Sequence, residues 1–200
     1  MKKKSGGAGV VAVILIAVVI VAAFVLVLRF RPRSAEDTTE VSEMDTLLNI
    51  DIAENYPSTP REVMKLYNRY IVCLYGAGDG KMNDAQMQAL GGKLRELYDE
   101  ELLGENPQEI NLQSLEEEIG SYREDGKVII QANVCGSNDV DYVDIDEESG
   151  ALVEVSYFMR GASDPKFTRT YQQFLLRKDA EGDWKILGFK QIDKPASEGD

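Results

Sequence analysis

The first pattern along the chain is an apolar run from Ala8 to Leu28, which contains no charged side chain. As a helix, a run of this length would rise about 31 Å, close to the roughly 30 Å hydrocarbon core of a bilayer. It is longer than the apolar core of a cleavable signal peptide, which has about 7 to 15 residues. The pattern therefore predicts an uncleaved signal anchor, with a basic tail at residues 1–7 and a transmembrane helix at residues 8–28.

Basic residues flank both ends of this run. Lys2, Lys3, Lys4 and the α-amino group precede it, and Arg29, Arg31 and Arg33 follow it. Lys and Arg favour the cytoplasmic side, and a long C-terminal domain translocates largely regardless of its charge, so the short tail is expected inside the cell. The sequence thus predicts a single-pass protein of the cell membrane with an extracytoplasmic C-terminal domain.

A linker is predicted at residues 29–55, first basic and then acidic. From Ser34 onward it is rich in Ser, Thr, Asp and Glu, and this part has too little apolar surface to offset the entropy of ordering. Four apolar residues near its end are expected to dock against the domain: Leu47, Leu48, Ile50 and Ile52. The domain is predicted at residues 56–193, and a disordered tail at residues 194–200.

The domain is expected to begin with a helix that has a clear start. Thr59 is the predicted N-cap, Pro60 stands at the first helical position, and Glu62 completes a capping-box pattern. The glycine-rich stretch 76–80 ends this helix. It lacks the spacing and the lysine of a phosphate-binding loop, so it is interpreted as a helix stop and loop.

Two further helices are expected before any strand. Asn83 with Gln86 predicts the start of the second, whose apolar face continues to Leu103. Gly91-Gly92 in its middle predicts either a close crossing with another element or a break. The third helix is expected to start at Asn106 and to be short.

Beyond residue 126 the apolar period changes from helical spacing to two, which predicts strands. The expected strands lie at residues 127–135, 151–160, 168–178 and 184–192. The connections between the last three are too short for crossover helices, so these strands should form an antiparallel meander. Helices followed by strands predict an α+β domain in which a curled antiparallel sheet covers the first helix.

Charge narrows the range of partners. Residues 34–200 carry 16 Lys and Arg residues against all 35 Asp and Glu residues of the chain, a net charge of −19. Repulsion from phosphates argues against nucleic acid and anionic lipid surfaces. The expected partners are the membrane through residues 8–28 and a protein partner or a second copy of the chain, while a small ligand stays open.

Cys73 and Cys135 are the two cysteines of the chain. One lies in a predicted helix and the other in a predicted strand. Apolar neighbours favour buried free thiols, although an oxidising compartment leaves a disulfide between them as an open alternative.

Candidate catalytic groups are few. The chain contains no histidine, which removes the commonest general base near neutral pH. A carboxylate base with a tyrosine as oxyanion donor is the remaining arrangement. The candidate donors are Tyr67, Tyr70, Tyr122 and Tyr157. Tyrosines on a helix face are more often core residues, so no catalytic, cofactor-binding or metal-binding residue is assigned.

The acidic stretch 139–148 is a candidate metal site by composition. Its carboxylates are Asp139, Asp141, Asp144, Asp146, Glu147 and Glu148. From Asp144 the spacing begins like a calcium loop, but Ser149 stands where the turn glycine should be and Val155 where the closing glutamate should be. An acidic strand and a hairpin turn ending at Gly150 are favoured instead.

Two pieces of the domain carry a family resemblance: the helix from Thr59 to Tyr75 and the final hairpin LLRKDAEGDWKILGF at residues 175–189. With three helices before long antiparallel strands, the domain resembles the nuclear transport factor 2-like, or cone, fold from about Tyr56 to Ile192. The whole layout is also similar to an uncharacterised family of small single-pass membrane proteins with such an extracytoplasmic domain. The resemblance implies a pocket between the concave sheet and the helices.

The expected function is that of a membrane-tethered binding or assembly module. Relatives of the cone fold include isomerases, dehydratases and protein-binding modules, and fold alone does not choose among them. Two alternatives stay open: an isomerase-like or lyase-like enzyme that uses a carboxylate and a tyrosine in the cone pocket, and a carrier of a hydrophobic ligand.

Overall fold

The computed structural model describes residues 42–76, 82–145, 148–161 and 167–194. The chain divides into two compact units, Met1–Val41 and Ser42–Asp200, and every described residue belongs to the second. The predicted basic tail and the predicted transmembrane helix at residues 8–28 lie outside the described residues, as does the first part of the predicted linker.

The end of the predicted linker forms a short helix. Helix α2, Glu43–Leu48, is capped by the Ser42 hydroxyl, which accepts a hydrogen bond from the Asp45 amide at 3.1 Å. Leu47 is fully buried, and its carbonyl accepts a hydrogen bond from the Tyr70 hydroxyl at 3.0 Å. Burial raises the pKa of Tyr70 to about 12. The segment docks through its apolar residues, as expected, but as a helix.

Helix α3, Pro60–Tyr75, begins as predicted, because the Thr59 hydroxyl accepts a hydrogen bond from the Glu62 amide at 3.2 Å. The Glu62 carboxylate in turn accepts hydrogen bonds from the Ser58 and Thr59 hydroxyls, which lowers the pKa of this exposed side chain. Ten of its 16 residues are buried, so α3 packs against the unit on more than one side.

Helix α4, Asp84–Arg95, has the predicted capping box at its start and runs through Gly91-Gly92 without a break. A Cβ atom on Gly91 would lie 2.6 Å from Leu112 Cδ2. Leu112 belongs to helix α6, Gln108–Glu124, so this glycine permits the two helices to cross closely. Of the two outcomes predicted for the glycine pair, the close crossing is the one observed.

Helix α4 ends well before Leu103 because the chain after it pairs with the sheet. The Ile186 amide donates to the Leu97 carbonyl at 2.8 Å, and the Asp99 amide donates to the Ile186 carbonyl at 2.9 Å. This extended junction separates α4 from helix α5, Glu100–Glu105. Long-range backbone pairing therefore overrides the continuous helical pattern.

Five strands form one antiparallel sheet. They are β1 (Val128–Val134), β2 (Asp141–Ile145), β3 (Glu148–Arg160), β4 (Phe167–Lys178) and β5 (Trp184–Ile192), with a short 3₁₀ helix, Ser137–Asp139, before β2. The strand order is β1-β3-β4-β5, and β2 pairs with the other half of the β3 edge that β1 occupies. The predicted β3–β4–β5 meander and the acidic strand β2 are confirmed.

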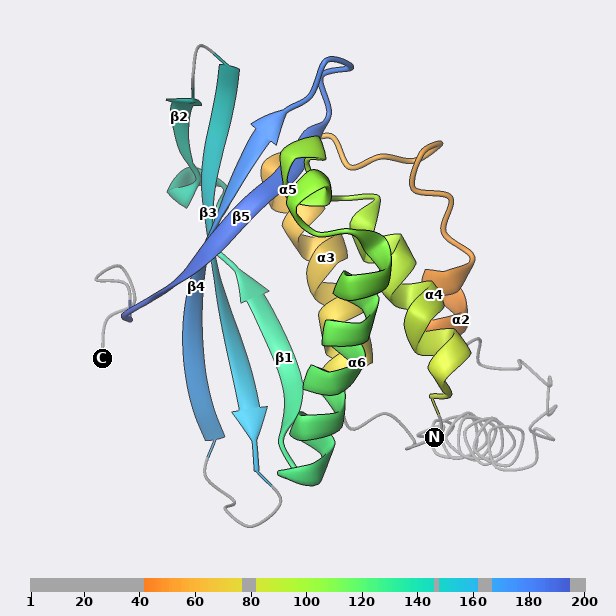
Figure 1. Cartoon of the computed structure of the whole chain (residues 1–200). Coiled ribbons are helices and arrows are strands. Elements are labelled where there is room, and N and C mark those ends of the chain that lie inside the picture. The colour runs from red at the N-terminus through yellow and green to blue at the C-terminus, as the bar shows by residue number, and fades with distance from the viewer. Residues whose placement is uncertain (1–41, 77–81, 146–147, 162–166, 195–200) are drawn as a thin grey trace, which may run out of the picture. The chain divides into compact units, whose positions relative to one another are not determined.

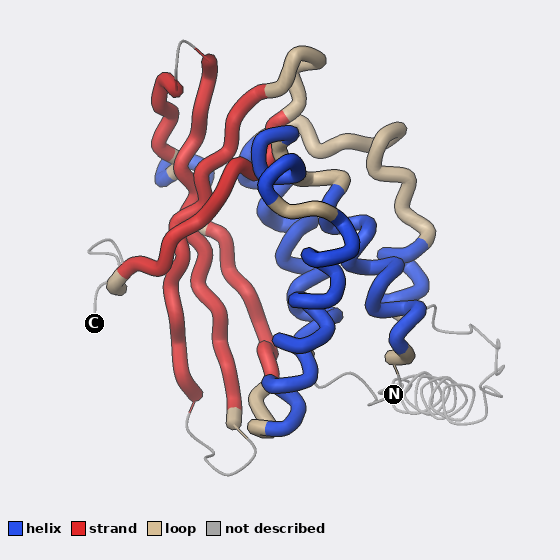
Figure 2. The backbone as a smooth tube through the Cα atoms, in the orientation of Figure 1, coloured by secondary structure: helices blue, strands red, loops and turns tan. Residues whose placement is uncertain are grey.

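The helices cover one face of the sheet (Figures 1 and 2), and α3 packs mainly alongside β1. The side chains that fill this inner face are fully or almost fully buried: Val153, Val155, Tyr157, Phe174 and Leu176. The ring centres of Tyr67 on α3 and Phe174 on β4 lie 5.3 Å apart, edge to face. The interior between α3 and the sheet is thus packed with side chains.

The predicted fold class, a transmembrane helix followed by a nuclear transport factor 2-like domain with three helices, is wrong. Within the described ranges, no helix is long and apolar enough to cross a membrane. The unit is an α+β fold in which five described α-helices precede or adjoin a five-stranded antiparallel sheet. The observed unit differs from the predicted domain at two places: α2 folds onto α3, and β5 pairs with the chain between α4 and α5.

A buried ion pair secures this junction. The Asp99 carboxylate is 5% exposed and lies 2.5 Å from Arg177 Nη2 on β4. The same carboxylate caps α5 by accepting the Glu101 amide at 2.9 Å. Hydrogen bonding to Asp99 raises the pKa of Arg177 further above its usual range. Asp99 thereby connects the junction between α4 and α5 to the N-terminus of α5 and to strand β4.

We expect Asp99→Ala to lower the free energy of unfolding of the full-length chain by about 1 to 3 kcal/mol, because Arg177 would lose its closest partner while Glu101 and Glu148 remain within reach. Urea unfolding followed by circular dichroism would measure this. Asp125→Ala, which removes the exposed Lys127–Asp125 pair, is the control and should leave the midpoint unchanged. Equal losses in the two variants would contradict a stabilising role for the Asp99–Arg177 pair.

Candidate binding site

A large hollow runs along β1. It has a cavity volume of about 1370 Å³ and is lined by one side of α3 and by every residue of β1 from Val128 to Val134. Successive strand residues point to opposite faces, so a hollow that touches all seven follows the edge of the strand. We call it the α3–β1 groove.

Helix α3 is held along this edge at both ends. Near its start, Arg61 Nε donates to the Cys135 carbonyl just after β1 at 2.7 Å. At its end, a Cβ atom on Gly76 would lie 3.5 Å from the Ile129 carbonyl and 2.3 Å from the Val72 carbonyl, so only glycine fits. The helix and the strand therefore run in opposite directions, and each is about 23 Å long.

The groove has an apolar floor and a cationic rim. Its apolar side chains include Val72, Met82, Ile130 and Val134. Its cations are Arg61, Lys65 and Arg69 on α3 and Arg123 and Lys127 before β1. The chain as a whole has a net charge of −13, so the five cations around this hollow form a local region of opposite charge.

One of these cations already holds a carboxylate. Arg69 contacts Glu43 of α2 through two hydrogen bonds, Nε to Oε1 at 2.8 Å and Nη2 to Oε2 at 3.3 Å. This pairing raises the pKa of Arg69. Both side chains are about half exposed, so the pair contributes little to stability but shows how the rim can bind a carboxylate.

Asn68 is a buried polar residue among the groove-lining residues. It is 4% exposed, and its Oδ1 accepts a hydrogen bond from the Tyr157 hydroxyl at 2.8 Å. Its Nδ2 is buried and has no hydrogen-bond partner among the described residues. Tyr157 belongs to β3 and pairs with Ala132 of β1, so Asn68 lies level with the middle of the groove.

The two cysteines are both half-buried free thiols. Cys73 lines the groove, and Cys135 follows β1 directly. Burial raises the pKa of each thiol, which keeps both in the less reactive protonated form.

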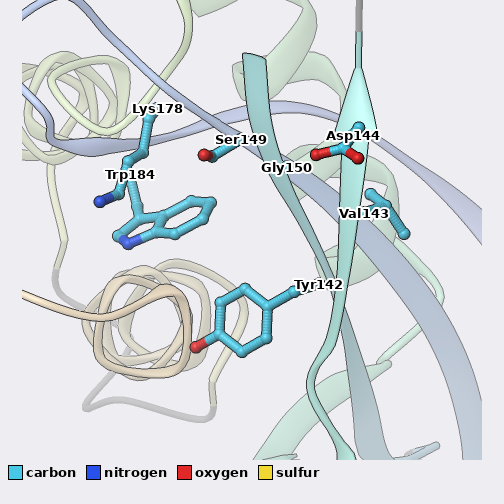
Figure 3. A pocket seen from close by; sticks show the side chains of 7 residues that line it. All are labelled: Tyr142, Val143, Asp144, Ser149, Gly150, Lys178 and Trp184. Carbon is cyan, nitrogen blue, oxygen red and sulfur yellow. The ribbon is translucent and has the colours of Figure 1, made fainter. Parts of the chain in front are cut away.

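A second, smaller hollow lies at the other end of the sheet. It has a volume of about 200 Å³ and lies between β2, the start of β3 and the β4–β5 hairpin. Figure 3 shows the Tyr142 and Trp184 rings beside each other, with Lys178 next to Trp184. The ring centres lie 5.9 Å apart, and the Lys178 ammonium lies 5.2 Å from the Trp184 ring centre. The Tyr142, Trp184 and Lys178 side chains thus contact one another, so this hollow is the weaker candidate for a binding site.

The predicted tyrosine donors are structural. Tyr67, Tyr70 and Tyr157 are buried, and Tyr122 packs edge to face on Tyr75 with ring centres 5.0 Å apart. The Tyr70 and Tyr157 hydroxyls bind a backbone carbonyl and an amide side chain. Asp99, the carboxylate that is buried in the described part, binds Arg177 instead of a tyrosine.

The acidic stretch around β2 does not gather into a metal site within the described residues, where no group of three potential ligands is found. Asp146 and Glu147 lie outside those residues. Asp141 and Asp144 belong to the β2 strand that pairs with β3.

Sequence reasoning missed the groove and its central residue. The available signal was an amide within a helical apolar stripe, because Asn68 follows Met64 by four positions and precedes Ile71 by three. The basic residues at positions 61, 65 and 69 recur every four residues, which places them on one side of the helix. Neither signal alone shows that β1 lies alongside α3.

The fold and the groove together define an α+β module with helices on one face of a sheet and a hollow at the sheet edge. The sequence matches the family described as Domain of unknown function (DUF6715) over residues 1–189, and the chain belongs to that family. No curated protein matches the sequence. The expectation of an uncharacterised family is confirmed in this coarser form.

We expect Tyr157→Phe to destabilise the full-length chain by about 1 to 3 kcal/mol, because both polar atoms of the Asn68 amide would then lack partners. The double variant Asn68→Leu/Tyr157→Phe removes the buried polar groups together and should regain that stability. Thermal unfolding of both single variants and the double variant measures the coupling. Additive losses would contradict the proposed interaction.

Proposed function

We propose that this chain is a binding or assembly module that holds a protein partner in the α3–β1 groove. The observation that carries the proposal is the buried Nδ2 atom of Asn68, an unused donor beside a cavity of about 1370 Å³. A buried unpaired donor costs about 1 to 3 kcal/mol, so a ligand acceptor would recover free energy on binding.

The chemistry of the groove supports binding rather than catalysis. Its lining combines apolar side chains with Arg and Lys, which suit recognition of an amphipathic partner. The Tyr70 and Tyr157 hydroxyls, two of the candidate oxyanion donors, are hydrogen-bonded within the core. Asp99 is occupied by Arg177 and by the N-terminus of α5.

Site-specific photo-crosslinking in the native cells would test the proposal. A photoreactive residue in place of exposed Lys65 should yield an adduct with another protein, whereas one in place of exposed Lys190 on β5 should not. Ile130→Glu, which places a carboxylate among the apolar side chains that line the groove, should abolish the Lys65 adduct. Persistence of the adduct in that variant, or equal adducts at both positions, would contradict binding in the groove.

We also propose, from the sequence pattern alone, that residues 8–28 hold the chain at the cell membrane with the C-terminal unit extracytoplasmic. The full-length chain should then remain in the membrane fraction after alkaline carbonate washing, and a chain lacking residues 8–28 should not. A reporter fused after Asp200 should be active only outside the cytoplasm. An extractable full-length chain or a cytoplasmic reporter would overturn this placement.

A further inference from the structure

We propose that the α3–β1 groove binds an extended, acidic segment of a partner protein, which pairs with the edge of β1 and accepts a hydrogen bond from Asn68. This inference rests on the proposed binding function and specifies its ligand. Four features of the groove support it: its size, its exposed strand edge, the spacing of its cations and its unused donor.

Size favours a peptide over a small molecule. Pockets for small ligands have volumes of about 300 to 1,000 Å³, and the groove exceeds this at about 1370 Å³. Its length follows all of β1, roughly 23 Å, which an extended chain of about seven residues would span.

The edge of β1 offers backbone pairing. β1 is the terminal strand of the β1-β3-β4-β5 order, and within the described residues no strand pairs with its outer edge. The register with β3 shifts between Ile129 and Gln131 and is regular from Gln131 to Val134. A bulge makes an edge a poor template, so the regular half is where a guest strand would pair.

The spacing of the cations matches an extended chain. Arg61, Lys65 and Arg69 are four residues apart on α3, which places them about 6 Å apart along the helix axis. Alternate residues of a strand are about 6.6 Å apart. Acidic side chains at every second position of a guest strand would therefore point toward α3 with the spacing of these cations, while the intervening side chains point to the opposite face of the sheet.

Asn68 lies level with Ala132, within the regular half of β1. Its buried Nδ2 donor is therefore level with the middle of the guest strand. The Arg69–Glu43 pair shows the same rim holding a carboxylate within the chain. The Nδ2 donor and the Arg69–Glu43 pair together indicate a ligand that accepts hydrogen bonds and carries negative charge.

Fluorescence anisotropy with the full-length chain in mild detergent would test the inference. The probes are nine-residue peptides that alternate Glu and Val, that alternate Gln and Val, and that hold the same Glu and Val residues in two blocks. The alternating acidic peptide should bind at least about tenfold more tightly than either other peptide, because only it matches the cations in register. Equal binding of the alternating and block acidic peptides would overturn the inference.

Two variants locate the bound peptide. Lys65→Glu should weaken binding of the alternating acidic peptide by about tenfold, since an attraction becomes a repulsion. Lys190→Glu, at an exposed site on the opposite edge strand, makes the same change in charge and should have less than about a twofold effect. Equal losses would place the peptide elsewhere or indicate only long-range attraction, and either result would overturn the inference.

Methylation of the peptide backbone tests strand pairing directly. N-methyl groups at alternate residues along one edge of the acidic peptide should abolish binding, and those on the other edge should not. If the Lys65 photo-crosslink forms but no acidic peptide binds, the groove has a different ligand and this inference alone fails. If the adduct is absent, the proposed function fails as well. An adduct with a second copy of this chain would also overturn the acidic-partner inference.

Discussion

The packing of helix α3 along the edge of the sheet is the constraint on which the rest of the structure depends. Ten of its residues are buried, which places the helix under the concave face while Arg61 and Gly76 hold its two ends close to β1. A helix fixed in this way leaves one side facing the strand edge. The groove is therefore a consequence of how the core is built.

The Asn68–Tyr157 bond lies where the core and the groove meet. An apolar pair of similar shape would pack at this position without leaving a buried donor unpaired. The buried Asp99 carboxylate shows the contrast, because it accepts three hydrogen bonds. The unused Nδ2 is thus a local departure from the packing rules, and such departures are typical of functional positions.

Much of the fold could be predicted from the sequence because its signals are local. The caps at Thr59 and Asn83 and the period-two strands depend on neighbouring residues alone. The α4–α5 junction could not be predicted, since it depends on the backbone of Ile186 almost 90 positions later. The groove was missed for the same reason: Asn68, Tyr157 and β1 meet only through tertiary packing.

The contrast between an acidic chain and a cationic groove bears on selectivity. At physiological ionic strength the Debye length is about 8 Å, so charges beyond that distance are largely screened inside the groove. An acidic segment approaching the protein is first repelled by its net negative charge and is attracted only once it lies close to Arg61, Lys65 and Arg69. Dispersed anions gain little from such a surface, whereas a segment with the matching spacing gains several contacts at once. The overall charge therefore acts against nonspecific anionic ligands, and the local charge favours an extended one.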